Sequence, residues 1–308
     1  MTRTPVALFT YNRVEHTARV LDSLANCARF EECSLHIYCD AAKTEEQTEA
    51  VESTRQLVRS QAEKLNATVV EQETNLGLAR SVVAGVTDLC DRFGNTIVVE
   101  DDLVLNPGFL DYMLQALDRY ADESAVYQIS GYMFPVSHHS GEDAFLMPLI
   151  TTWGWATWQR AWKIFDWDAS EAHEQLKDPT LRKRFDLNNS YPYSVILENQ
   201  LNGLTNSWGI LFWWQVFKAG GLALHPRRSF VWNGGFDSSG TNCGDQGWSN
   251  DQSPEEVTDW THESFKFPSE VTIDQKAFDN ICAFLKKEQY PASLAGRIKR
   301  KLQTMLRA

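Results

Sequence analysis

Residues 96–110 read TIVVEDDLVLNPGFL. A short apolar run, typical of a buried strand, leads directly into three consecutive acids, Glu100, Asp101 and Asp102, and the chain then turns at an Asn-Pro-Gly sequence. Burying one unpaired carboxylate is unfavourable, and crowding three of them together is more so. We therefore expect something positively charged to lie at the end of this strand.

Strands and helices alternate in the sequence around this segment. Four apolar runs have the length and composition of strands, and the stretches between them carry apolar residues at helical spacing. This alternation predicts an α/β fold with a mostly parallel sheet flanked by helices. The expected strands are 5–10, 35–39, 68–71 and 96–100, and the expected helices are 14–27, 45–65 and 75–93.

Polar residues follow each of these four strands. Tyr11, Asn12 and Arg13 follow the first strand, Asp40 follows the second, and the segment 75–80 follows the third. Parallel sheets bind ligands at the carboxyl ends of their strands. One carboxylate at a strand end is more often a cap or a loop charge, but four polar clusters together favour a ligand site at this edge.

The second half of the chain is less regular. It contains a Trp-rich stretch, TTWGWATW at 151–158, and a glycine-rich stretch at 233–247. The other elements expected here are strands at 125–131, 222–226 and 229–232, a helix over 169–189 and a helix pair within 193–217.

Composition limits the class of protein. The chain has 308 residues with 43% hydrophobic content and a formal net charge of −12, so it can bury a sizeable core and does not suit a general nucleic-acid binder. Its six cysteines include no CxxC pair, which favours reduced thiols over disulfides or a zinc site. Nowhere do 18 apolar residues follow one another, and the N-terminal apolar run is too short for a signal peptide. We expect a cytoplasmic protein.

The C-terminal stretch 293–308 has five basic residues and no acid. Leu294, Ile298, Leu302 and Met305 would form one apolar stripe on a helix, with a cationic remainder. Such a helix either lies at an anionic membrane surface, which would make the protein peripheral at the inner face of the plasma membrane, or docks on its own domain.

The acidic triplet is suited to a divalent cation. Side chains alternate along an extended chain, so Glu100 and Asp102 share one side while Asp101 points to the other. Mn²⁺ and Mg²⁺ prefer oxygen ligands and are held by one or two carboxylates together with phosphate oxygens and water. The triplet therefore predicts a metal cofactor and a phosphate-bearing substrate.

These motifs resemble a known fold. VVEDDLVLNPGFL, the N-terminal strand and turn that end at Arg13, and the segment 75–80 are similar to the GT-A fold of nucleotide-sugar glycosyltransferases. The likeness is to bacterial family-2-type enzymes and to the N-acetylglucosaminyltransferase I type, whose Glu-Asp-Asp plays the part of the Asp-x-Asp motif. The resemblance implies a GT-A domain over 1–250, with a nucleotide-binding half at 1–122, an acceptor half at 123–250, and a helical extension over 251–308.

The resemblance also implies roles for individual residues. In the family the last acid of the triplet ligates the metal, so Asp102 is the expected ligand, and Asp101 reaches the ribose or the donor sugar. His225 ends an expected strand and either completes the metal shell or is an ordinary strand-end histidine. The implied donor site comprises Thr10, Tyr11, Arg13, Asp40, Asn75, Arg80, Glu100 and Asp101.

An inverting transfer, which the resemblance implies, needs a carboxylate that takes the proton of the acceptor hydroxyl. Glu198, ahead of a Trp-rich segment, and Asp237, in the glycine-rich stretch, are the candidates, with Asp166 and Asp168 as further options. Each of them is otherwise a surface or capping acid.

Trp153, Gly154 and Trp155 offer flat apolar faces with a gap between them. They either stack on an acceptor sugar or pack in the core.

We therefore expect a metal-dependent glycosyltransferase that moves a sugar from a nucleotide-sugar donor to a glycan or lipid-linked acceptor in surface polysaccharide synthesis. One rival is a metal-dependent phosphoryl-transfer enzyme, although such enzymes usually attack with an Asp after the first strand, where this chain has Thr10, Tyr11 and Asn12. The other rival is a non-catalytic carbohydrate-binding protein that uses its tryptophans and a bound cation.

Overall fold

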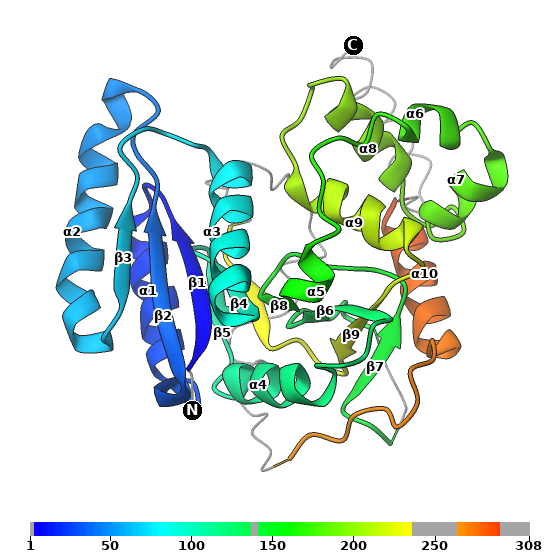
Figure 1. Ribbon diagram of the computed structural model, residues 1–308, viewed down its shortest axis with the longest axis horizontal. Coiled ribbons are helices and arrows are strands. Elements are labelled where there is room, and N and C mark those ends of the chain that lie inside the picture. Colours follow the sequence, from blue (N-terminus) through cyan, green and yellow to red (C-terminus); the bar gives the residue numbers. More distant parts are fainter. Residues whose placement is uncertain (1–2, 137–140, 236–263, 290–308) are drawn as a thin grey trace.

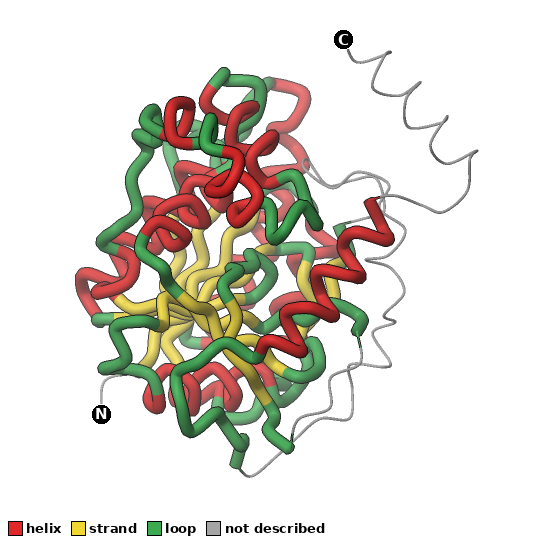
Figure 2. Tube along the Cα trace, turned by 90° about the vertical axis from the view of Figure 1, so that its right-hand side faces the viewer, coloured by secondary structure: helices red, strands yellow, loops and turns green. Residues whose placement is uncertain are grey.

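The computed structural model describes residues 3–136, 141–235 and 264–289. Asp237 and the basic stretch 293–308 lie outside the described residues. Figure 1 shows a large central sheet with helices around it, and Figure 2, turned by 90°, shows the strands crossing the middle of the molecule.

Four parallel strands form the first half of the sheet. They are β1 (Thr4–Thr10), β2 (Cys33–Cys39), β3 (Thr68–Glu71) and β4 (Asn95–Glu100), in the spatial order β3-β2-β1-β4. β1 is buried on both faces from Pro5 onward, as expected of a central parallel strand made of continuous apolar residues. The sequence-based prediction of these four strands is confirmed.

Three helices cover this half of the sheet: α1 (Val14–Ala25), α2 (Thr48–Leu65) and α3 (Leu78–Phe93). α1 packs on α2, whereas α3 packs on β1 and β4, and Figure 1 shows α3 on the opposite side of the strands from α1 and α2. α3 ends at Gly94, whose φ of 85° is the left-handed conformation that commonly terminates helices. Two short 3₁₀ turns, Phe30–Glu32 and Glu45–Gln47, complete the connections.

The second half continues the same sheet with mixed strand directions. β8 (Trp155–Trp158) runs antiparallel to both β4 and β6 (Val126–Ser130), β9 (Leu222–Pro226) is parallel to β6, and β7 (Ala144–Met147) is antiparallel to β9. Four of the seven neighbouring pairs in this eight-stranded sheet are therefore parallel. The predicted α/β fold with a mostly parallel sheet flanked by helices is confirmed, but β7 and β8 were not expected as strands.

A small second sheet follows β4. β5 (Leu103–Leu105) pairs antiparallel with β10 (Val231–Asn233), so a late segment of the chain returns to the residues that follow β4. α4 (Phe109–Arg119) begins directly after the Asn-Pro-Gly sequence, where the Asn106 side chain accepts a hydrogen bond of 2.8 Å from Gly108 N. The turn thus starts a helix, as the sequence indicates.

Helices form a cap above the second half of the sheet (Figure 1). The expected helix over 169–189 is broken at Asp178, whose extended backbone caps a second short helix that begins at Pro179, and Leu187, Asn188 and Asn189, all with left-handed φ values, follow the end of that helix. The expected helix pair within 193–217 is confirmed as α8 and α9. The cap helices are α5 (Gln159–Trp162), α6 (Ala172–Gln175), α7 (Pro179–Phe185), α8 (Tyr193–Leu201) and α9 (Trp208–Lys218), and α10 (Gln275–Gln289) lies beside β7.

The core under this cap is largely aromatic. Trp155 stacks on Trp208 with ring centroids 5.1 Å apart, and Trp162 packs on Phe212 at 4.8 Å. The five described cysteines are all buried and free, in agreement with the expected reduced thiols. Among the described helices, none is both long enough and apolar enough to cross a bilayer.

Candidate functional site

The acids that end β4 meet an arginine that follows β1. Parallel pairing of β1 with β4 brings the carboxyl ends of the two strands side by side, so Arg13 lies beside residues 88 positions later in the chain. Its Nη2 donates hydrogen bonds to Asp101 Oδ1 and, over 3.2 Å, to Asp102 Oδ2. We call Glu100, Asp101 and Asp102 together with Arg13 the acidic rim. The predicted positive charge is present, as a side chain of the protein itself.

The acidic rim has more negative than positive charge. Burial, followed by the charges of Asp102 and Asp101, raises the pKa of Glu100 to about 8. Burial also raises the pKa of Asp101 to about 6, because it outweighs the opposing effect of Arg13. Burial disfavours the charge of Arg13, but the two aspartates more than offset this and raise its pKa. One arginine therefore does not neutralise three crowded acids.

A backbone segment from the far end of the fold closes over Asp102. Gly234 N donates a hydrogen bond of 2.8 Å to the Asp102 carbonyl, and Gly235 N donates one of 2.7 Å to Asn233 Oδ1. A Cβ placed on Gly235 would lie 2.5 Å from Asp102 Oδ2, so a larger residue would displace that carboxylate. The sequence analysis did not identify Asn233, Gly234 or Gly235 individually. Their only signal is a glycine pair after an expected strand.

Asp40 and Asn75 tie a loop to the end of β2. Asp40 accepts hydrogen bonds from the backbone nitrogens of Leu76 and Gly77 at 2.9 and 2.8 Å, and from Asn75 Nδ2 at 3.1 Å. The backbone nitrogen of Ala41 supplies a further bond of 2.9 Å. Both oxygens of Asp40 are thus engaged by the protein, which organises the segment leading into α3.

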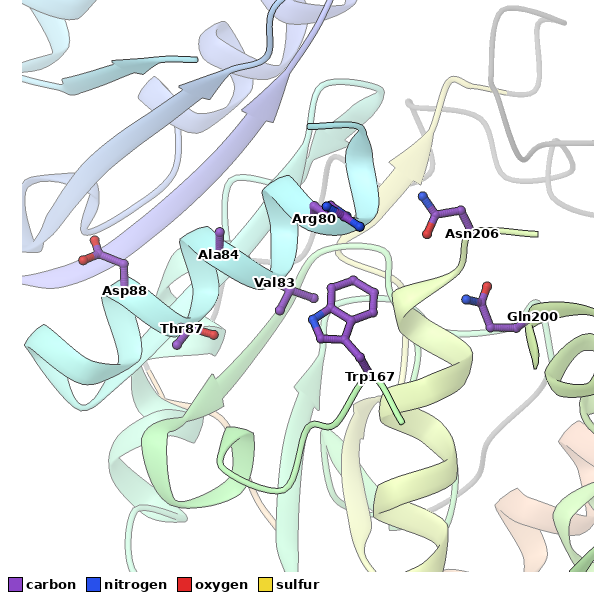
Figure 3. A pocket seen from close by; sticks show the side chains of 8 residues that line it. All are labelled: Arg80, Val83, Ala84, Thr87, Asp88, Trp167, Gln200 and Asn206. Carbon is purple, nitrogen blue, oxygen red and sulfur yellow. The ribbon is translucent and has the colours of Figure 1, made fainter. Parts of the chain in front are cut away.

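The residues after β1 have similar anchoring roles. Thr10 is buried, and its hydroxyl contacts the Tyr38 carbonyl at 3.4 Å. The Tyr11 hydroxyl donates to the Gln47 side chain and accepts from Lys43 N at 3.0 Å, which fixes the segment after Asp40. Of the expected donor-site residues, the structure joins Arg13, Glu100 and Asp101 with Asp102, whereas Thr10, Tyr11, Asp40 and Asn75 hold the neighbouring loops. Arg80 lies in the first turn of α3 and lines a separate cavity (Figure 3).

His225 lies in the core and not at the acidic rim. Its Nε2 is 2.8 Å from the Leu149 carbonyl, and its ring stacks on Phe145 with centroids 5.9 Å apart. Burial lowers the pKa of His225 to about 4, which keeps the ring neutral. Within the described part of the chain, no group of three or more His, Cys, Asp or Glu side chains could hold a metal by itself, and the contacts of His225 given above do not include Asp102.

The expected acceptor platform packs against the protein. Trp155 is 0% exposed, so it offers no surface to a sugar, and this expectation is corrected by its burial. Gly154 has a φ of 58° and accepts a close backbone hydrogen bond from Gly131, whose lack of a side chain allows the approach. Trp153 is half-buried, with its ring edge-on to Tyr132 at 4.5 Å.

Glu198 is held by an ion pair. Arg182 donates to its two carboxylate oxygens at 2.7 and 3.2 Å, across the contact between α7 and α8. Asp166 and Asp168 are exposed, and their side chains accept hydrogen bonds from backbone nitrogens two residues later. None of these three acids joins the acidic rim through a hydrogen bond or ion pair among the described contacts.

No protein-family model and no curated protein matches this chain. Solved structures that resemble it include a mannosyltransferase, PcManGT, from Pyrobaculum calidifontis in complex with GDP-Man and Mn²⁺, at 20% identity over 42% of this chain and 34% of that one, with a TM-score of 0.31. Residues 1–349 of S. aureus TarS match at 15% identity over 76% and 61% of the two chains, with a TM-score of 0.46.

GalNAc-T7 with UDP, GalNAc and Mn²⁺ matches at 10% identity over 74% of this chain and 42% of that chain, with a TM-score of 0.46. The chain therefore spans less than two thirds of each of these three structures. Because the identities are 20% or lower and the TM-scores 0.46 or lower, we draw neither a family nor a function from these likenesses.

Proposed function

We propose that this chain is a metal-dependent glycosyltransferase of GT-A architecture that moves a sugar from a nucleotide-sugar donor to a glycan or lipid-linked acceptor. The acidic rim carries this proposal, because it gathers Glu100, Asp101 and Asp102 at the carboxyl edge of a parallel sheet with one counter-ion, Arg13. That edge is where such sheets bind nucleotides. The surplus of negative charge favours a cation there.

The residues of the acidic rim fit a hard divalent ion. The three acids of the rim supply carboxylate oxygens, which Mn²⁺ and Mg²⁺ prefer, and phosphate and water oxygens would complete the shell of such an ion. Gly235 leaves space directly above Asp102 Oδ2, which a Cβ would fill. Such an ion, bound at Asp102, would stabilise the negative charge that develops on the leaving nucleoside diphosphate.

Arg13 has two functions in this proposal. It holds Asp101 and Asp102 in place through Nη2, while its Nη1 is buried without a hydrogen-bond partner among the described residues. A buried, unpaired guanidinium nitrogen is unfavourable and is relieved by an anion. We assign Nη1 to a phosphate oxygen of the donor, beside the metal.

The proton acceptor for an inverting transfer remains Glu198 or Asp237 in this proposal. To act as a base, Glu198 must turn its carboxylate toward the acceptor hydroxyl and away from Arg182, which now donates to both of its oxygens. A Glu198→Gln variant that binds donor and still transfers sugar at the normal rate would exclude Glu198.

Calorimetric titration tests the proposed function. Uridine, guanosine, thymidine, adenosine and cytidine diphosphates are titrated into the full chain, first with MnCl₂ and then with EDTA. We expect at least one of them to bind with manganese and to lose affinity with the chelator. Binding of none of them, or binding that is indifferent to chelator, would contradict the proposal.

We also propose that the protein acts in surface polysaccharide synthesis at the cytoplasmic face of the plasma membrane. The support is the basic and apolar pattern of 293–308. Co-sedimentation with vesicles that contain phosphatidylglycerol compares the full chain with one ending at residue 292. Equal sedimentation of the two chains would exclude membrane binding through this stretch.

A further inference from the structure

A cavity of about 770 Å³ lies between α3 and the cap helices (Figure 3). One wall is a single face of α3, which runs from Arg80 to Asp88 at helical spacing. The opposite wall comes from Trp167 and from Gln200 and Asn206 near the connection between α8 and α9. Its volume is within the range of small-molecule binding sites.

Trp167 is an exposed aromatic side chain that is supported from one side. It is 44% exposed, which is unusual for a side chain of this size. Phe165 meets its ring edge-on at 5.2 Å, and Phe165 is itself stacked on Trp162 at 4.9 Å. Asp166 and Asp168 each form a side-chain turn on either side of it. The indole is therefore fixed in position while much of it remains open to the cavity.

The polar groups of the cavity suit a ligand with hydroxyl groups. Asp88 is paired with Arg92, with 2.7 Å between Asp88 Oδ2 and Arg92 Nη1, so its charge is already offset by the protein. The Gln200 side-chain oxygen accepts from Ser207 N at 2.6 Å, which directs the amide nitrogen of Gln200 toward Trp167 (Figure 3).

Across the cavity, Asn206 and Arg80 point toward each other (Figure 3). The Thr87 hydroxyl accepts a hydrogen bond of 2.9 Å from Trp162 Nε1, so its own proton is available for donation. An aromatic face flanked by amide, guanidinium and hydroxyl groups can stack on the C–H face of a pyranose while donating to its hydroxyls.

We propose that this cavity binds a pyranose, stacked on Trp167, and that this sugar belongs to the acceptor glycan. Arg80 lies three residues after Gly77, which Asp40 fixes at the end of β2, so the cavity begins near the sheet edge that carries the acidic rim. Only the assignment of this sugar to an acceptor glycan rests on the proposed function. Sugar binding in the cavity stands independently of it.

Fluorine NMR of the full chain labelled with 5-fluorotryptophan tests sugar binding. The Trp167 signal is identified by its loss in a Trp167→Phe variant. The probes are cellobiose, maltose, lactose, mannobiose and chitobiose, each titrated to high millimolar concentration. We expect at least one of these disaccharides to shift the Trp167 signal saturably. If none of them does, the inference is wrong.

Variants separate the cavity from other surfaces. Trp167→Ala and Gln200→Ala should each weaken binding of the active disaccharide, Trp167→Ala by about tenfold or more, and Trp167→Phe by less because it keeps a ring. Leu204→Ala, an equally conservative truncation of a 73% exposed side chain that does not line the cavity, should bind as the wild type does. Unchanged binding in both cavity variants would overturn the inference.

The same variants distinguish this inference from the proposed function. Trp167→Ala should bind nucleoside diphosphate with manganese as the wild type does and should raise the KM for the acceptor more than it lowers kcat. If nucleotide binds but no disaccharide does, the cavity inference fails and the proposed function stands. If a disaccharide binds but no nucleotide does, the sugar site stands and its assignment to an acceptor fails.

Discussion

Asp40 and Asp102 both follow strands of the same parallel sheet, yet their surroundings differ. Asp40 has both oxygens occupied by backbone and side-chain donors from its own and a neighbouring loop. Asp102 shares one arginine with Asp101, and Gly235 leaves room above its Oδ2. A carboxylate at a strand end is therefore able to bind a ligand only where the chain has not already supplied its hydrogen bonds.

Replacing Asp102 with Asn tests the contrast between Asp102 and Asp40 most directly. We expect metal-dependent turnover to fall by roughly a hundredfold or more, because a metal ligand is lost at the site where charge develops. Stability should be unchanged or increased, since one negative charge is removed from a rim that has more negative than positive charge. Donor hydrolysis with manganese and urea unfolding measure the two effects, with the exposed Asp118→Asn as the matched control. Full activity in Asp102→Asn with chelator present would refute the assignment.

Asp40→Ala should lower the stability of the protein, which Asp102→Asn should not. It leaves the backbone nitrogens of Leu76 and Gly77 without their partner, and we expect the free energy of unfolding to fall by about 2–3 kcal/mol. Urea unfolding measures this loss, and Asp118→Ala should change it by less than about 0.5 kcal/mol. If Asp40→Ala kept its stability and lost nucleotide binding, Asp40 would be a donor ligand, as the resemblance alone implies.

Gly235→Ala tests the space above Asp102. The new methyl group would push against Asp102 Oδ2, and we expect manganese affinity to fall by about tenfold. Titration of manganese in the presence of the bound nucleoside diphosphate measures the change. Gly141→Ala is the control, because an added Cβ there meets no atom within 4 Å. Equal affinity in both variants would show that the close approach has no role in the site.

Glu100→Gln tests the crowding of acids at the acidic rim through the pH dependence of stability. The pKa of Glu100 is raised from 4.5 to about 8, so between these values the folded state keeps a proton that the unfolded state has released. Stability must then fall as pH rises through this window. The variant removes this dependence. As pH rises, the free energy of unfolding of the variant should therefore increase relative to that of the wild type, by at most about 1.4 kcal/mol for each pH unit.

Urea unfolding of the Glu100→Gln variant and the wild type at about pH 5 and about pH 8, without metal, measures that gain. If the difference in stability between the variant and the wild type were the same at both pH values, the acidic rim would not raise the pKa of Glu100.

The first half of the fold could be predicted from the sequence because its strands are buried on both faces. Strands of this kind are continuous apolar runs, and β1, β2, β3 and β4 all lie within two residues of their predicted bounds. β8 was missed because the sequence leaves Trp155 between stacking on a sugar and packing in the core, and neither interpretation places it in a strand. Aromatic residues indicate a large apolar area, but not whether that area faces the core or the solvent.

The acidic rim could be predicted in part. The three acids at the end of β4 indicated a positive partner, but which cation it was depended on the β1–β4 register, which brings Arg13 to Asp101. The occupied oxygens of Asp40 depend on a loop 35 residues later, so no local pattern reveals them. Trp167 carried no signal either, because a single tryptophan between two aspartates has no periodicity.

The antiparallel strand β8 lies between β4 and β6 and hydrogen-bonds to both, so it joins the two halves of the molecule edge to edge. Because both halves pair with this strand, neither half can be transferred to another protein as an independent unit. A fragment that stopped at residue 122 would leave the whole outer edge of β4 as a template for aggregation, because its backbone groups would lack a neighbour. Any working chimera would have to carry β8 along with β1, β2, β3 and β4.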